Sequence, residues 1–379
     1  MNISKSSLWE KPWPQPSSIR VPLADVHLSK ASHSMVNEAL TSNWIGPGGR
    51  FNKMAEEELS RLSNTKTLLV SNGSVALSLA LAALNIGAGD EVLVPALTYA
   101  ATASTVVWSG ASPVFCDSNL DDWIISIESM RQALTPKTKA IIVVHLYGVL
   151  GDMKKIMEFA RENDLMVIED SAEALFANKA ETDRGDVTTY SFFANKLITS
   201  GEGGAVSTNN PRLYKRMEIL RGQGMDPSRR YYFLEPGFNF RMSNLQAAVL
   251  VGQLTQIESI SKMRLNQENR YQEILGSKFT RPEPVSKTGR VPWIYTAAIE
   301  DMHGEKKFEI AEKLAQTGIE TRPVFYPLDE MPAFQKFSRI ENSVSRDIAS
   351  RGISLPTGPH VSNDIQDEIC EIILTSLGG

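Results

Sequence analysis

Between residues 66 and 207 the chain alternates between strand-like apolar runs and helix-like stretches. The runs predicted to be strands are Lys66–Val70, Glu91–Val94, Pro113–Cys116, Lys139–Val144 and Leu165–Ile168. The stretches predicted to be helices include Val75–Leu84, Ala100–Trp108 and Met153–Asn163. Strands that alternate with helices of roughly 10–15 residues are typical of βαβ units around a mostly parallel sheet. This part of the sequence therefore predicts an α/β fold.

The helical patterning lengthens after Pro211. Ser243 is a candidate N-cap for a helical pattern that continues to about Ile274 and that we expect to bend. Further predicted strands and helices lie at Trp293–Ile299, Lys306–Thr317, Glu320–Phe325 and from Asn363 onward. This mixture indicates a small α+β domain. We expect the following organisation: an N-terminal arm at 1–20, a large α/β domain at 21–255 and a small α+β domain at 256–379.

Composition narrows the functional class. The chain has 379 residues and a formal net charge of −5, which gives no support for a nucleic-acid partner. The chain has two cysteines, Cys116 and Cys370. So small a number argues against a disulfide framework and favours a reducing compartment. No run reaches the length of a membrane span, and the N-terminus lacks the apolar core of a signal peptide. We therefore expect a cytoplasmic protein without a membrane or nucleic-acid partner.

A lysine and two acids form the pattern with the clearest chemistry. The strand Leu165–Ile168 is followed by Asp170 and Glu173, and Lys196 precedes a glycine-rich turn. A pyridoxal phosphate enzyme needs a lysine that bonds to the cofactor aldehyde and a buried carboxylate that keeps the pyridine nitrogen protonated. An acid that only caps a turn, or a lysine on the surface, would produce the same residues. The combination favours a site for this cofactor.

A glycine–serine turn could hold a phosphate. Gly73 and Ser74 follow one predicted strand and open the next helix, where free N–H groups and the helix dipole favour an anion. The hydroxyl of Ser191, five residues before Lys196, could add a donor. Such a turn can also be only a tight connection between a strand and a helix. We expect no metal site.

Seven segments in a fixed order carry a family resemblance. They are Ser71–Ser74, Val94–Tyr99, Val144–Gly148, Ile168–Asp170, Ser191–Lys196, Gly201–Gly204 and Gly237–Met242. This set resembles the nucleotide-sugar aminotransferases of the DegT/DnrJ/EryC1/StrS type, which are fold type I pyridoxal 5'-phosphate (PLP) enzymes. The resemblance extends from about Val21 to the C-terminus. It implies a mostly parallel sheet flanked by helices, with a smaller α+β C-terminal domain.

The resemblance also implies roles for four residues around the cofactor ring. Lys196 matches the catalytic lysine that bonds to the cofactor and moves a proton. Asp170 matches the partner of the pyridine nitrogen, and Glu173 matches a group near the phenolic oxygen. Tyr99 matches the aromatic residue that stacks on the ring.

Four further positions match the family at the cofactor phosphate. Gly73, Ser74 and Ser191 match the phosphate cradle. Asn239 matches an asparagine that reaches the phosphate from a second subunit. The resemblance therefore implies a homodimer with shared active sites, and it leaves open whether dimers pair into tetramers.

The resemblance to one branch of the family also implies a substrate. Two segments, 220–232 and 318–327, most resemble the branch that moves an amino group from L-glutamate to C4 of GDP-4-keto-6-deoxymannose in polysaccharide sugar biosynthesis. Candidate substrate residues are Arg229, Arg230, Arg322, Tyr326 and His145. Solvated loops, a structural ion pair and a core histidine are the alternatives at these positions.

Three other functions stay open. A related aminotransferase would take a dTDP- or UDP-linked keto-sugar. A PLP-dependent sugar dehydratase carries histidine where Lys196 stands, and a non-catalytic regulator would bind the cofactor without turnover. Compared with the family pattern, the loop at 177–186 looks short, Ala194 replaces a commoner glycine and the arm before Val21 is additional.

Overall fold

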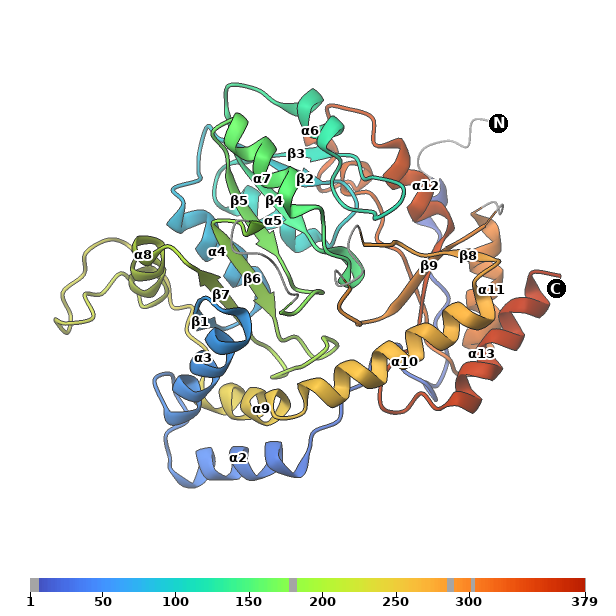
Figure 1. Cartoon of the computed structure of the whole chain (residues 1–379), viewed down its shortest axis with the longest axis horizontal. Helices are drawn as coiled ribbons and strands as arrows, with labels where there is room; N and C mark the ends of the chain where they lie inside the picture. The colour runs from blue at the N-terminus through green and yellow to red at the C-terminus, as the bar shows by residue number, and fades with distance from the viewer. Residues whose placement is uncertain (1–6, 177–182, 285–289, 301–303, 379) are drawn as a thin grey trace.

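The computed structural model describes residues 7–176, 183–284, 290–300 and 304–378. A seven-stranded sheet forms the centre of the larger domain (Figure 1), in the order β1-β7-β6-β5-β4-β2-β3. The strands are β1 Lys66–Val70, β2 Glu91–Pro95, β3 Ser112–Cys116, β4 Thr138–Val144, β5 Met166–Asp170, β6 Val187–Ser191 and β7 Gly204–Thr208. Only β7 in this sheet runs antiparallel to its neighbours, β1 and β6. The predicted mostly parallel α/β fold is therefore confirmed.

Helices cover both faces of this sheet. They are α2 Lys30–Thr41, α3 Arg50–Ser63, α4 Gly73–Ala83, α5 Ala100–Trp108, α6 Ile127–Ala133, α7 Met153–Glu162, α8 Pro211–Arg221 and α9 Asn244–Leu254. Along β1, Leu68 and Val70 pack into the core that contains α4, whereas Leu69 packs into the core that contains α3 and α9. Successive side chains of a strand point to opposite faces, so each face requires its own apolar partner. Buried strands of this kind explain the nearly continuous apolar runs in the sequence.

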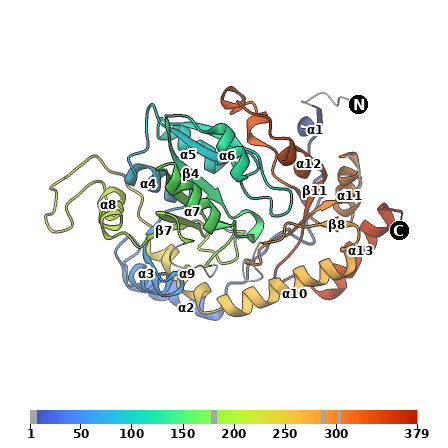
Figure 2. The ribbon, with the colours of Figure 1, turned by 45° about the horizontal axis from the view of Figure 1, so that its top comes forward.

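The smaller domain is built on a second sheet, in the order β10-β11-β9-β8, whose neighbouring strands are all antiparallel. Its strands are β8 Phe279–Thr280, β9 Tyr295–Ile299, β10 Arg322–Pro323 and β11 Gly352–Leu355. Its helices are α10 Ile257–Leu275, α11 Glu305–Gln316, α12 Ser343–Arg351 and α13 Asn363–Ser376, and Figure 2 shows α10 running between the two domains. This is the predicted small α+β domain.

The long helical segment is two helices rather than one bent helix. Ser243 caps α9 with a reciprocal capping box to Gln246, as its N-cap pattern predicted. The first helix ends at Leu254 and α10 begins at Ile257. The expected bend is therefore a break of two residues between separate helices.

The N-terminal arm packs along the small domain. It includes a short helix, α1 Ser7–Glu10, which lies beside α11 and α12 (Figure 2). Val21, the first residue of the expected large domain, packs into the core of the small sheet and bridges to Ile319. The chain thus contacts the small domain before it enters the large one, while the exact domain boundaries stay predictions. Residues 177–182 of the loop that looked short lie outside the described residues.

Across the described ranges, no helix is both long enough and apolar enough to cross a membrane.

Candidate active site

Three of the predicted cofactor residues, Asp170, Ser191 and Lys196, lie at the carboxyl ends of β5 and β6, where ligands bind in open α/β sheets. Asp170 is the last residue of β5, and Ser191 is the last residue of β6. Lys196 lies in the turn that follows β6, and its backbone N–H donates to the carbonyl of Phe193 at 3.0 Å. One pocket is lined by Ala172, Glu173, Leu175, Ser191, Lys196, Leu197, Ile198 and Trp293. Sequence-distant groups with complementary chemistry therefore share one cavity.

Asp170 is a buried carboxylate that is held from two sides. Its Oδ1 accepts the backbone N–H of Ala172 at 3.1 Å, and its Oδ2 accepts the hydroxyl of Thr102 at 3.2 Å. Burial raises the pKa of Asp170, while these donors and the charge of Lys196 oppose that rise. A cationic ring nitrogen nearby would hold such a carboxylate in its charged form. Thr102, from the first turns of α5, is a supporting residue that the sequence did not reveal.

The amine of Lys196 lies between a carboxylate and an aromatic face. Its Nζ is 3.5 Å from Glu173 Oε1 and 4.1 Å from the centroid of the Trp293 ring. The indole N–H of Trp293 donates to the carbonyl of Asn195 at 2.8 Å, which fixes the ring beside the lysine turn. A side-chain exposure of 14% keeps Lys196 accessible from the pocket. Trp293 comes from the small domain, and nothing in the local sequence pattern pointed to it.

Glu173 connects the lysine to the strand end of β4. Its Oε2 accepts the backbone N–H of Tyr147 at 2.8 Å, while its Oε1 faces Lys196. Burial raises the pKa of Glu173, and the charge of Lys196 is the largest influence in the opposite direction. Tyr147 has a φ of 49°, a left-handed conformation that directs its amide toward the carboxylate. The Glu173 carboxylate therefore orients both the amine of Lys196 and the backbone N–H of Tyr147.

The turn before α4 leaves room for an anion. Asn72 caps this helix by accepting the N–H of Val75 at 2.9 Å, so the first amides of the helix are left for another partner. A Cβ on Gly73 would lie 2.9 Å from Cβ of Ser191, so glycine is required for this close approach. Ser74 follows in the first turn of α4. The helix N-terminus and a nearby hydroxyl thus fit the phosphate of PLP. The lysine fits its aldehyde, and the buried acid fits its ring nitrogen.

Tyr99 is the residue before α5 and is 62% exposed. Its ring lies 5.8 Å from the ring of Phe325. It is not among the residues that line the Lys196 pocket. Its predicted stacking on the cofactor ring stays a prediction.

His145 lies in the core, and its predicted role at the substrate stays a prediction. Its side chain is completely buried, and its Nε2 lies 2.8 Å from Oε2 of Glu169, which is also completely buried. The N–H of Gly151 points to its Nδ1 at 3.4 Å. The conservative alternative, a core histidine, is therefore correct in placement, although its main partner is a carboxylate rather than the backbone.

The other candidate substrate residues lie outside the pocket. Arg229 and Arg230 are exposed on the loop after α8, which projects from the body of the molecule (Figure 1), and Arg229 pairs with Asp226. Arg322 is exposed and pairs with Glu320 at 3.2 Å. Within one chain none of these arginines reaches Lys196, so their predicted roles stay predictions.

Two more candidates are also outside the pocket. Asn239 is exposed, and its backbone bridges to Gly222 at the base of the projecting loop. Tyr326 is half-buried, with its ring 4.8 Å from the ring of Trp9. Neither residue lines the Lys196 pocket. The predicted role of Asn239 at the site of a neighbouring subunit therefore stays a prediction.

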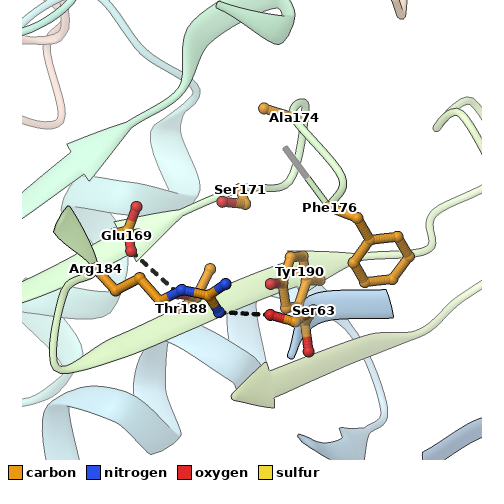
Figure 3. Close-up of a pocket in the computed structure, with 8 residues that line it drawn as sticks. All are labelled: Ser63, Glu169, Ser171, Ala174, Phe176, Arg184, Thr188 and Tyr190. Carbon is orange, nitrogen blue, oxygen red and sulfur yellow. Dashed lines mark hydrogen bonds between the residues drawn. The ribbon is translucent and has the colours of Figure 1, made fainter. Parts of the chain in front are cut away.

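A second pocket lies beside the end of β5 (Figure 3). It is lined by Ser63, Glu169, Ser171, Ala174, Phe176, Arg184, Thr188 and Tyr190. Glu169 accepts the hydroxyl of Thr188, and Arg184 donates to the carbonyl of Ser63. These contacts hold β5, β6 and α3 together behind Asp170. Among the described residues, no group of three or more His, Cys, Asp or Glu side chains could hold a metal ion.

Known proteins are similar to this chain in both sequence and fold. The profile of the DegT/DnrJ/EryC1/StrS aminotransferase family matches residues 27–374. A GDP-perosamine synthase of Caulobacter vibrioides is 39% identical over 346 residues, which cover 89% of this chain and 93% of that protein. A GDP-perosamine synthase of Escherichia coli O157:H7 is 39% identical over 362 residues, 93% of this chain and 97% of that protein.

Solved structures agree with this grouping. A protein assigned as a sugar aminotransferase from Streptococcus pneumoniae superposes in its PLP-form with a TM-score of 0.85. That chain is 27% identical, and the match covers 97% of this chain and 98% of the other. The agreement extends over both domains.

Proposed function

We propose that this chain, which belongs to the DegT/DnrJ/EryC1/StrS aminotransferase family, is a PLP-dependent aminotransferase of nucleotide sugars. The observation that carries the proposal is the placement of Lys196 and Asp170. Asp170 is a buried acid at a strand end, and Lys196 lines the adjoining pocket with its amine toward the pocket. The solved relative in its PLP-form supports the choice of cofactor.

Each part of the cofactor has a suitable group in the Lys196 pocket or at the strand and helix ends beside it. The carboxylate of Asp170 would hold the pyridine nitrogen, and the amine of Lys196 would bond to the aldehyde. The first amides of α4, with Ser74 and Ser191, would bind the phosphate. When bound, PLP serves as the electron sink that makes the α-carbon of an amino acid acidic.

The protein's own groups supply the proton transfer. Lys196, once its amine is free, would take a proton from the amino-acid α-carbon and return it at the former aldehyde carbon of the cofactor, on the other side of the transferred nitrogen. Positioned proton transfer of this kind contributes about 10²–10⁴ in rate. The Glu173 carboxylate, 3.5 Å away, orients the amine, and the Trp293 ring covers its other side.

We propose L-glutamate as the donor and a GDP-linked 4-keto-6-deoxysugar, GDP-4-keto-6-deoxymannose, as the acceptor, with GDP-perosamine as the product. The two relatives named GDP-perosamine synthase, each 39% identical over nearly the whole chain, support this acceptor. The lysine at position 196 separates the chain from dehydratases, which carry histidine there. The free, buried thiols of Cys116 and Cys370 are consistent with a cytoplasmic site of action.

A panel of substrates tests this choice. The purified holoenzyme is incubated with glutamate and with GDP-, dTDP- or UDP-linked 4-keto-6-deoxysugars, and the product mass is measured. We expect the GDP-linked sugar to gain an amino group in place of the ketone oxygen. Faster conversion of a dTDP- or UDP-linked sugar would overturn the nucleotide assignment but not the aminotransferase chemistry. No amination of any sugar, with glutamate left unchanged, would overturn the activity itself.

We also propose a homodimer in which the projecting loop completes the partner's site. The loop carries an exposed apolar run of Tyr231, Tyr232, Phe233 and Leu234, between 49% and 72% exposed. An exposed apolar patch of this size favours contact with another protein surface. Asn239 and the two arginines of the loop would then face the cofactor phosphate and the substrate diphosphate of the neighbouring subunit.

Mixed dimers test the shared site. Lys196→Ala and Asn239→Asp variants are each expected to have low activity, whereas dimers formed from a mixture contain one intact site. Recovery of activity on mixing would support the shared arrangement. Additive activities without recovery, or a monomer by light scattering, would overturn it.

A further inference from the structure

Two tryptophans anchor the N-terminal arm to the small domain. The Trp9 ring lies 4.8 Å from the ring of Tyr326, and the Trp9 indole N–H donates to Glu330 Oε2 at 2.6 Å. The Trp13 indole N–H donates to the carbonyl of Thr321 at 2.9 Å. The two indoles therefore hold both ends of the segment that begins at Thr321 and ends at Glu330. These contacts span 321 and 308 residues of sequence.

The same indoles enclose the amine of Lys307 on α11. The Lys307 side chain is 1% exposed, and its Nζ donates to the carbonyl of Ala349 at 2.6 Å. Its Nζ lies between 5.5 and 5.9 Å from the ring centroids of Trp9, Trp13, Phe308 and Tyr326. Aromatic faces attract an ammonium group at this range. The arm, α11 and the 321–330 segment are thus joined around one amine, which we call the Lys307 box.

A stack of three rings leads to the active site from Phe325, the sequence neighbour of Tyr326 in this box. The Phe325 ring stacks on Tyr147 with centroids 5.4 Å apart and planes 17° apart. The backbone N–H of Phe325 donates to the Tyr147 hydroxyl at 3.0 Å. The Tyr147 ring in turn stacks on Trp293 at 6.3 Å, and the Trp293 ring lies against the Lys196 amine. Tyr326, which Trp9 contacts, is the direct neighbour of Phe325.

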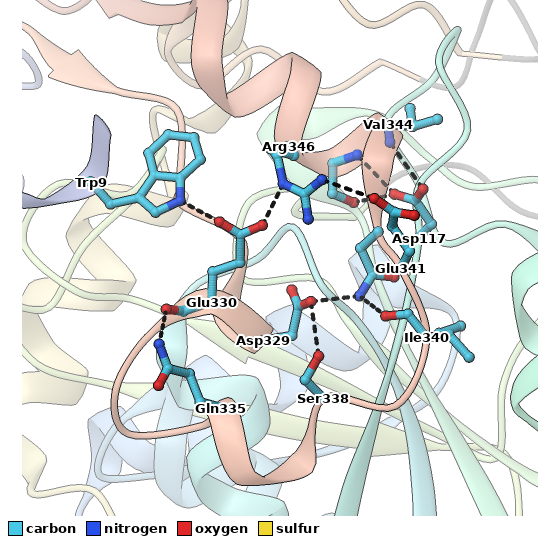
Figure 4. A network of polar contacts seen from close by, with 12 residues as sticks. Trp9, Asp117, Asp329, Glu330, Gln335, Ser338, Ile340, Glu341, Val344 and Arg346 are labelled. Atoms are coloured by element: carbon cyan, nitrogen blue, oxygen red, sulfur yellow. Dashed lines mark hydrogen bonds and ion pairs between the residues drawn. The ribbon is translucent and has the colours of Figure 1, made fainter. Parts of the chain in front are cut away.

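A polar network fixes the other end of the segment (Figure 4). One oxygen of the Glu330 carboxylate accepts from Trp9, while the other accepts from Arg346 on α12. The carboxylate of Asp117, just after β3, accepts the N–H of Val344 at the start of α12 at 3.0 Å. Glu330 therefore ties the arm to a helix that is itself bonded to the large domain. The contacts of the arm therefore extend through Glu330 and α12 to the large domain.

We propose that residues 9–13 form a strap that positions the stacked rings of Phe325 and Tyr147. These rings pack against Trp293, which lines the Lys196 pocket, and we call them the active-site wall. Trp9 and Lys307 are positioning residues in this proposal, since neither reaches the pocket. The strap holds Tyr326 in place, Tyr326 fixes the direction of Phe325, and Phe325 sets the Tyr147–Trp293 stack beside Lys196. Its consequence for the sugar substrate rests on the proposed function, whereas its effect on the wall does not.

Hydrogen exchange of the holoenzyme tests the strap directly. The backbone N–H of Phe325 bonds to Tyr147, and the backbone N–H of Leu328 bonds to the carbonyl of Ala96 at 2.9 Å. In Trp9→Ala we expect exchange at these two amides to speed up about tenfold, because the segment opens locally more often. Strands β4 and β5 should keep their wild-type exchange. Trp9→Phe, which keeps a ring against Tyr326, should restore most of the protection.

Trp108→Ala is the matched control, since Trp108 is 69% exposed and lies outside the ring stack. Unchanged exchange at Phe325 and Leu328 in Trp9→Ala would overturn the strap. Faster exchange throughout both domains would also overturn it, because the arm would then only stabilise the fold. Either result is obtained whether or not the enzyme aminates a sugar.

The kinetic consequence is a shift in sugar affinity. Trp9→Ala should raise KM for the sugar nucleotide about fivefold, with kcat changed less than about twofold, since the wall is displaced but Lys196 keeps Glu173. The single-turnover reaction with glutamate should be unchanged. Equal losses in both half-reactions would overturn a positioning role at the sugar side. If the wild-type protein showed no turnover, the proposed function would be overturned. The strap would then be tested by the hydrogen-exchange result alone.

Discussion

Lys196 and Lys307 are both largely enclosed and both lie against aromatic rings, yet they have different surroundings. Lys196 has a carboxylate within 3.5 Å and lines a pocket with a helix N-terminus nearby. Among the described residues, the amine of Lys307 contacts aromatic rings and the carbonyl of Ala349, and the arm covers it. Burial lowers the pKa of Lys307 to about 7. A buried lysine therefore becomes a reactive group only when the fold also provides a charge partner and an opening for the substrate.

The comparison also separates two kinds of aromatic contact. Trp293 covers one side of an amine that must change partners during the reaction. The rings of the Lys307 box surround an amine with no access, so their attraction and packing can only hold segments together. Four changes to the protein would test this contrast.

The largest effect is expected for Lys196→Ala. Loss of the amine removes both the covalent attachment of PLP and the proton transfer, so turnover should fall by at least about 10⁴. The visible absorbance of the bound cofactor should change, and circular dichroism should still report a folded protein. Lys53→Ala, at a side chain that is 80% exposed, is the control. Retained turnover would show that the wrong lysine has been assigned.

Asp170→Asn comes next. The amide has the size of the carboxylate but no charge, so it cannot keep a ring nitrogen protonated in a buried site. We expect single-turnover rates with glutamate to fall about 100-fold or more, roughly 2.7 kcal/mol. Thr102→Val removes one hydrogen bond to the same carboxylate and should cost only about tenfold. Similar losses in both variants would mean that geometry, and not charge, is the contribution of Asp170.

Gly73→Ala should have a moderate effect on cofactor affinity. The added methyl would lie 2.9 Å from Cβ of Ser191, so the turn and the strand end must move apart at the proposed phosphate site. We expect PLP to bind about tenfold more weakly, which equilibrium dialysis would measure. Gly46→Ala adds a methyl with no atom within 4 Å and serves as the control. Equal affinities in the two variants would argue against a phosphate at the start of α4.

The smallest effect concerns the pH dependence of stability through Lys307. Its pKa is lowered from 10.5 to about 7, so between these values the unfolded chain binds more protons than the folded chain. The Lys307 contribution to stability therefore rises with pH across this window, by at most about 1.4 kcal/mol per pH unit, and is flat below it. Lys307→Met removes the titrating amine. The wild-type minus variant difference in unfolding free energy, from denaturant titrations, should increase from pH 7 to 10. A constant difference would mean that the amine stays charged inside the box.

Several elements follow directly from local sequence. The strand Lys66–Val70 and the helix Ala100–Trp108 were predicted with the bounds that the structure has, since a buried strand and an Ala-rich helix carry strong local signals. The positions of Asp170 and Lys196 were also visible, because one ends an apolar strand and the other precedes a glycine-rich turn. The helices α2 and α3 were not predicted, and the long helical segment was read as one bent helix.

What the sequence alone determined is the alternation of strands and helices, the identity of the lysine and its acid, and the family to which they point. The tertiary structure decided which groups surround them. Trp293 is 98 residues from Asn195, Phe325 is 178 residues from Tyr147, and Thr102 is 68 residues from Asp170. From its position after a strand, His145 could belong either to the substrate site or to the core. The packing places it in the core, against Glu169. Local pattern encodes which face of an element is apolar, whereas the partner of each side chain depends on how distant segments pack, and that is a property of the whole chain.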